Sequence, residues 1–149
     1  MFVPAGFEPP AGLESDAFRL EPLGPEHDDR DYAAWSSSIE FIQSLPGYGP
    51  EHGWPHLMTP AENHADLERH AKDFVDRTGF TYTVRDPDGE VVGCVYVYPA
   101  DDEAHDAHVR SWVVESRAAL DVPLRQTVAD WLASDAWPFE RPLYAPLLG

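Results

Sequence analysis

Side chains with flat rings and polar tips gather in one short stretch of this sequence. Tyr48, His52, Trp54 and His56 fall within residues 48–56, where glycine and proline indicate an irregular loop. Ring faces attract cations, and hydroxyl and imidazole groups orient the polar atoms of a ligand. The stretch therefore predicts one wall of a pocket for a small or flexible, cationic molecule. The alternative is that Trp54 covers the core beneath the loop.

A second wall is predicted from two later patterns. Tyr96 and Tyr98 are two residues apart in a strand-like run, so they share one face; packing against a helix is their alternative role. Arg110 lies between His108 and Trp112 at the same spacing in a later run. An unpaired guanidinium on a central strand is costly, which favours a role in binding an anionic group. Its alternative is a stem packed on Trp112 with the charge in water.

The histidine spacings do not predict a metal site. His105 and His108 are three apart in a strand pattern and point to opposite faces, while His64 and His70 are six apart in a helical pattern and lie well separated. Cys94, the single cysteine, lies in an apolar strand and is interpreted as a small core residue.

A β-hairpin at 80–85 and 91–98 must position these residues. Its turn, Asp86-Pro87-Asp88-Gly89, combines an aspartate that can bond the backbone, a proline with fixed φ and a glycine that tolerates positive φ. The second strand is apolar on both faces, so we expect it in the middle of a covered sheet.

The flanking elements follow from periodicity and capping signals. We expect a strand at 17–23 and a helix from Pro25, whose buried stripe is Tyr32, Trp35, Ile39 and Ile42. Thr59 and Glu62 form a capping box for a second helix that ends at Thr78-Gly79. A strand at 108–114, a helix beginning near Pro123 and a short strand near 143–145 complete the chain.

Composition limits the class of protein. With 149 residues and 43% hydrophobic content, we expect a single domain at 17–149 preceded by an extended arm at 1–16. The 27 acidic and 10 basic residues give a net charge of −17, which excludes nucleic acid and anionic membranes as natural partners. The lone cysteine and the lack of a long apolar run or basic leader predict a cytoplasmic protein.

The order of elements between Phe18 and Tyr144 resembles that of the GCN5-related N-acetyltransferases. The resemblance also rests on the strand Gly89-Glu90-Val91-Val92-Gly93-Cys94-Val95 and on the arginine-led segment after the next strand. It implies an α/β (α+β) fold, a central mixed, mostly antiparallel sheet of about five to six strands flanked by three helices. It also implies acetyl-CoA as the donor and an amine of a small molecule as the acceptor.

The resemblance also implies where coenzyme A binds. Backbone groups near Val113 and Val114 would bind its pantetheine arm, and the segment 115–124 would bind its pyrophosphate. The family pattern there is Arg or Gln, two residues, Gly, one residue, then Gly or Ala, since small residues let phosphate approach the backbone. Arg117 fills the first position, but Leu120 and Val122 replace the small residues. A shifted loop would use the following residues: Ser116, Arg117, Ala118, Ala119 and Arg125.

The catalytic candidates are Glu115, as a base acting through water, and Tyr144, as an acid for the departing thiolate. Their alternatives are a solvated strand end and a packed sheet tyrosine. Two other functions stay open: a catalytically inactive module that binds a ligand, and a structural protein whose free sheet edge forms a homodimer.

Overall fold

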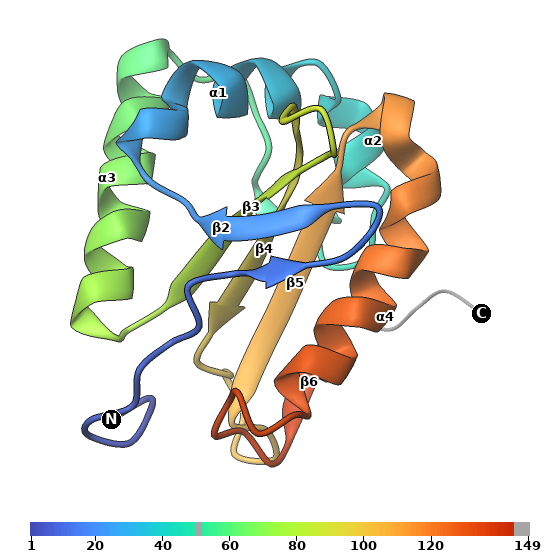
Figure 1. Cartoon of the computed structure of the whole chain (residues 1–149). Helices are drawn as coiled ribbons and strands as arrows, with labels where there is room; N and C mark the ends of the chain where they lie inside the picture. The colour runs from blue at the N-terminus through green and yellow to red at the C-terminus, as the bar shows by residue number, and fades with distance from the viewer. Residues whose placement is uncertain (50–51, 145–149) are drawn as a thin grey trace.

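A six-stranded sheet organises the computed structural model, which describes residues 1–49 and 52–144 (Figure 1). The strand order in the sheet, β1-β2-β3-β4-β5-β6, is also the order in the chain. Neighbours are antiparallel except β5 and β6, which are parallel, so the predicted mixed, mostly antiparallel sheet is confirmed. The strands are β1 Leu13–Glu14, β2 Arg19–Pro22, β3 Phe80–Arg85, β4 Val91–Tyr98, β5 Ala107–Val113 and β6 Pro142–Tyr144.

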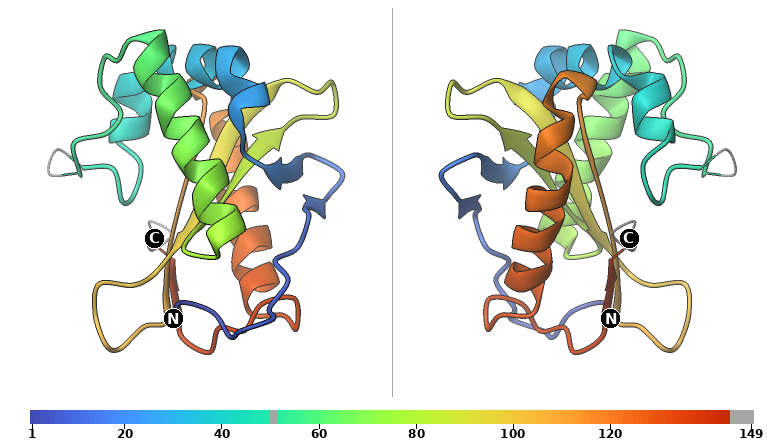
Figure 2. Two further views of the ribbon diagram at one scale, coloured as in Figure 1. Left: turned by 90° about the vertical axis from the view of Figure 1, so that its left-hand side faces the viewer. Right: turned by 90° about the vertical axis from the view of Figure 1, so that its right-hand side faces the viewer.

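Helices cover both faces of this sheet. Figure 2 shows α1 (blue) and α3 (green) on one face and α4 (orange) on the other. The α-helices are α1 Asp28–Ser36, α2 Ile39–Gln43, α3 Pro60–Asp76 and α4 Asp121–Leu132, and the 3₁₀ turns are η1 Pro25–His27 and η3 Glu115–Leu120. Among the described residues, no helix has the length and apolarity that a membrane span requires.

The central hairpin forms as predicted. The Asp86 carboxylate accepts hydrogen bonds from the amides of Asp88 and Glu90 at 2.9 and 3.0 Å, and Gly89 has φ of 86°. Strand β4 lies between β3 and β5, and Cys94 within it is fully buried, so the predictions of a central strand and a core cysteine are confirmed.

The prediction of one long first helix was wrong. The chain leaves the helix at Ser37 and Ser38 and resumes it as α2, so the described residues form four α-helices where three were expected. Ser38 has φ −134° and ψ 26°, and the Ser37 hydroxyl donates to the Ala34 carbonyl at 2.8 Å. Serine hydroxyls compete for backbone groups in this way and favour helix ends.

The second helix has the predicted capping box. The Thr59 hydroxyl accepts from the Glu62 amide at 3.1 Å, and the Glu62 carboxylate accepts from the Thr59 amide at 2.9 Å. The helix ends slightly before the predicted Thr78-Gly79, because Arg77 adopts left-handed backbone angles with φ of 61°. The Arg77 Nε donates to the Phe7 carbonyl at 2.7 Å, which holds the N-terminal segment beside this helix end.

The N-terminal segment packs along the sheet. Phe2 and Phe7 contact Phe80 with ring centroids 5.9 and 6.2 Å apart, and the Tyr82 hydroxyl donates to the Pro10 carbonyl at 2.7 Å. At the other end of the chain, the predicted last strand includes Ala145, which lies outside the described residues; β6 covers the preceding three.

Candidate functional site

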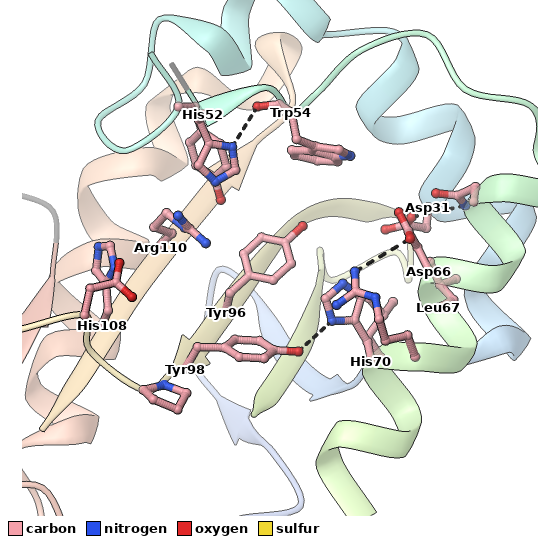
Figure 3. A pocket seen from close by; sticks show the side chains of 16 residues that line it. Asp31, His52, Trp54, Asp66, Leu67, His70, Tyr96, Tyr98, His108 and Arg110 are labelled. Carbon is pink, nitrogen blue, oxygen red and sulfur yellow. Dashed lines mark hydrogen bonds and ion pairs between the residues drawn. The ribbon is translucent and has the colours of Figure 1, made fainter. Parts of the chain in front are cut away.

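A pocket of about 450 Å³ opens on the face of the sheet that α1 and α3 cover. Figure 3 shows its side chains coming from the two helices, from β4 and β5 and from the loop before α3. Of the residues predicted to bind substrate, the following line it: Tyr48, His52, Trp54, Tyr96, Tyr98 and Arg110. The exposed side chain of His56 is not among them; its Nδ1 lies 2.8 Å from the Gly53 carbonyl oxygen.

Strand register builds the floor of this pocket. Tyr98 is opposite His108 and Tyr96 is opposite Arg110, so these four side chains share one face of the sheet. The Trp112 Nε1 donates to the Tyr96 hydroxyl at 2.9 Å, which fixes that ring against the neighbouring strand. The floor is therefore a stiff aromatic surface with a guanidinium beside it.

Trp54 has both of the roles considered from the sequence. Its ring lies 5.6 Å from that of Trp35 and 6.0 Å from that of Trp112, so it covers buried rings. It also lies 6.4 Å from the Tyr96 ring, in an edge contact, and lines the pocket. The loop thus closes the core and forms a pocket wall with the same side chain.

Asp31 lines the pocket and was not predicted from the sequence. It comes from α1, is only 4% exposed and accepts a hydrogen bond from the Asn63 Nδ2 at 3.5 Å. Burial, aided by the negative charges of Asp28 and Asp66, raises the pKa of Asp31 to about 7. Asp31 precedes Trp35 by four residues and therefore lies on the same face of the helix, and this spacing could have predicted that Asp31 is buried.

His70 is the second missed residue. Its Nδ1 lies 3.0 Å from both the Tyr98 hydroxyl and the Thr81 hydroxyl, and Tyr98 donates onward to the Asp73 carboxylate at 2.8 Å. Burial lowers the pKa of His70 to about 4, so its ring is neutral at pH 7. These hydrogen bonds fix the position of the Tyr98 ring in the floor of the pocket. Within residues 1–49 and 52–144, no cluster of three metal-binding side chains occurs.

Comparison with known proteins yields matches only among solved structures. The sequence matches no protein-family profile and no curated protein. A ribosomal-protein-S5-alanine acetyltransferase from Vibrio fischeri aligns at TM-score 0.61 and 12% identity, covering 83% of this chain and 67% of that chain. The chain thus spans about two thirds of the length of that protein.

Two further structures agree. The microcin C7 self-immunity acetyltransferase MccE, solved with acetyl-CoA and AMP, aligns at TM-score 0.59 and 14% identity over 86% of this chain and 70% of that chain. The GNAT domain of S. lividans PAT aligns at TM-score 0.58 and 17% identity over 87% and 77%. The chain has the GCN5-related N-acetyltransferase (GNAT) fold.

The resemblance to the GNAT family implied that the segment after β5 binds the pyrophosphate of coenzyme A. Here Ser116, Ala118 and Ala119 are small and exposed, so their side chains leave the backbone at these three positions accessible to a phosphate. Partly exposed Arg117 lies among them, although its Nη1 is bound to Asp86 at 3.0 Å. The three small side chains are compatible with a phosphate group beside the backbone, while Leu120 stands where the GNAT pattern has glycine.

Arg125, a predicted coenzyme A residue, is buried and bonded within the protein. Its side chain is buried, its Nε donates to the Asp121 carboxylate at 3.1 Å and its Nη2 donates to the Pro46 carbonyl at 3.4 Å. The guanidinium also lies over the Tyr144 ring, 5.3 Å from its centroid. Arg125 therefore ties α4 to the loop after α2 and to β6.

The two catalytic candidates lie away from the pocket. Tyr144 pairs with Val109 in the β5–β6 register, and the Tyr144 hydroxyl donates to the Ser111 hydroxyl at 2.6 Å. Glu115 is exposed and its amide donates to the Ser38 hydroxyl at 3.0 Å. Buried Val113 and Val114 precede it at the end of β5. Neither candidate lines the pocket, whose titratable side chains include Asp31 and His70 instead.

Proposed function

We propose that this chain is an N-acetyltransferase that uses acetyl-CoA to acetylate an amine of a small molecule bound in the pocket. The observation that carries the proposal is the buried carboxylate of Asp31 in the same pocket as the rings of Trp54 and Tyr96, in a chain with the GNAT fold. When bound, acetyl-CoA would supply the acetyl group as a thioester: the amine nitrogen would form the new C–N bond, the C–S bond would break, and coenzyme A would leave as the thiol with a proton from the amine. The remaining requirement is a bound amine that has lost its proton.

Asp31 meets that requirement chemically. An alkylammonium ion is attracted by a carboxylate and by ring faces, so the ammonium binds between Asp31 and the aromatic floor. A base works best when its pKa lies near the working pH, and the pKa of Asp31 is raised to about 7. Asp31 thus accepts the ammonium proton and leaves a neutral, nucleophilic amine.

The proposed binding site for acetyl-CoA is a short surface at the end of β5 and along η3. The backbone near Val113 and Val114 is assigned to the pantetheine arm, and the phosphates are assigned to Ser116, Arg117, Ala118 and Ala119. These are the small exposed residues and the partly exposed arginine of η3. The Arg117 side chain carries the positive charge nearest to that surface.

A second candidate is a ligand-binding module without catalysis. It is favoured by the ion pairs Arg117–Asp86 and Arg125–Asp121, which engage both arginines of the segment within the protein. In this case the pocket binds the same cationic ligands and coenzyme A does not bind. The two candidates therefore differ in one measurable property, affinity for the coenzyme.

The experiment incubates the full chain with acetyl-CoA and a mixture of primary amines. Released thiol and acetylated products are measured, and a parallel thermal-shift titration reports binding of acetyl-CoA. Acetyl transfer that falls about 100-fold in Asp31→Asn supports the transferase, since removing a general base typically costs this much. No thermal shift at millimolar acetyl-CoA, together with retained amine binding, overturns it in favour of the binding module.

A further inference from the structure

Two opposite charges that are not paired with each other line the pocket. Arg110 extends from β5, and Asp31 from α1; among the described residues, neither forms an ion pair with another side chain. Figure 3 shows the Tyr96 ring between them. The pocket thus presents a cation and an anion on either side of a flat apolar surface.

The other charges of the pocket are already compensated. Arg69 lies 3.6 Å from the Asp66 carboxylate and 3.9 Å from that of Asp73. His70 is held by hydroxyl groups, and Asp101 is exposed to water. Asp31 is buried and Arg110 is half-buried. Withdrawing a charge from water without a counter-charge raises the free energy of the site, so a ligand that supplies both counter-charges gains from each, and more at Asp31.

We propose that the ligand of this pocket is zwitterionic, a small molecule whose amine pairs with Asp31 and whose carboxylate pairs with Arg110. This inference rests on the proposed function in one respect: the amine that pairs with Asp31 is taken to be the group that is acetylated. The hydrocarbon between the two ends lies on the ring of Tyr96. Arg110 thereby selects among amines, because a guanidinium binds a carboxylate through two parallel hydrogen bonds.

A carboxylate fits this position better than a phosphate. The chain carries a net charge of −17, and the pocket contains Asp66 and Asp101 besides Asp31. One guanidinium balances a singly charged carboxylate, whereas a doubly charged phosphate would keep an excess charge in a negative field. The ligand class is therefore an amino acid in the broad sense, with its amine at a distance from its carboxylate.

The test measures binding by calorimetry without acetyl-CoA. The probes are ω-amino acids from glycine to aminohexanoate, the alkylamine and the carboxylic acid matched to each in chain length, and aminoalkyl phosphates. We expect at least one ω-amino acid to bind about tenfold more tightly than its matched alkylamine and more tightly than its phosphate analogue. Equal binding of amino acids and alkylamines across the series overturns the proposal.

Variants assign the preference to Arg110. Arg110→Gln is expected to bind ω-amino acids no better than alkylamines, while Arg19→Gln removes the same charge from an exposed position on β2 and keeps the preference. Circular dichroism of each variant verifies folding, and Arg110→Lys, which keeps the charge and loses the bidentate geometry, is expected to lose only part of the preference. A preference that survives in folded Arg110→Gln also overturns the proposal. Failure of acetyl transfer alone leaves these binding results intact.

Discussion

The Nη1 atom of Arg117 lies 3.0 Å from Oδ2 of Asp86, which joins the segment after β5 to the turn between β3 and β4. The same carboxylate accepts the amides of Asp88 and Glu90. One buried side chain therefore shapes the hairpin turn and anchors the segment assigned to coenzyme A. The positions of these two parts of the chain depend on each other.

Removal of either partner is expected to destabilise the protein unequally. Asp86→Ala loses the turn contacts as well as the ion pair, and we expect a loss of about 2 to 3 kcal/mol in the free energy of unfolding. Arg117→Ala is expected to cost about 1 kcal/mol, because its partner keeps two amide donors. Urea denaturation measures both, and an Arg117→Ala cost larger than that of Asp86→Ala contradicts this account.

The raised pKa of Asp31 predicts that the free energy of unfolding falls as pH rises. Its pKa is about 7 when folded, compared with an ordinary value of 3.8, so between these values the folded state holds a proton that the unfolded state has released. The wild type should therefore lose stability as pH rises from 4 to 7. Asp31→Asn lacks this loss and is expected to gain on the order of 3 kcal/mol relative to wild type across that range, measured by urea denaturation at each pH.

His70 acts in the opposite direction. Its pKa is about 4 when folded, compared with 6.5 for an ordinary histidine, so its contribution is complete above pH 6.5 and is lost as pH falls toward 4. His70→Gln should therefore lose less stability than wild type on acidification, by on the order of 2 kcal/mol. In the wild type the pH dependences due to Asp31 and His70 partly cancel. The control is Asp31→Asn, which retains His70 and should therefore lose stability on acidification without the opposing effect of Asp31.

Tyr48 carries a hydroxyl that the fold does not use. The side chain is 1% exposed, and within the described residues its oxygen has no hydrogen-bond partner. A buried polar group without a partner costs free energy, so Tyr48→Phe is expected to raise the free energy of unfolding by about 1 kcal/mol. A clear fall in melting temperature would show that the hydroxyl is satisfied.

Local signals explain what the sequence could predict. The Asp-Pro-Asp-Gly turn and the Thr59–Glu62 capping box act within a few residues, and both appear as expected. The break at Ser37 and Ser38 could not be predicted with them, because the Ser38 hydroxyl is fixed by the amide of Glu115, far along the chain.

The same distinction applies to the pocket. Tyr96 and Tyr98 were predicted together because alternation along one strand sets their common face. Asp31 and His70 were missed because their surroundings come from other elements: Asn63 on α3 bonds the first, and Tyr98 and Thr81 on the sheet bond the second. His56 shares a loop with Trp54, yet only the loop conformation decided which ring turned inward.

The sheet has its strands in chain order, and this has a kinetic consequence. The β3–β4 and β4–β5 pairs join segments that are adjacent in the sequence, so little loop entropy opposes their formation and we expect them to form early in folding. The β2–β3 pair joins strands separated by the long segment that contains α1 and α3, so more loop entropy opposes its formation. We therefore expect the tyrosine floor to form before the wall that carries Asp31.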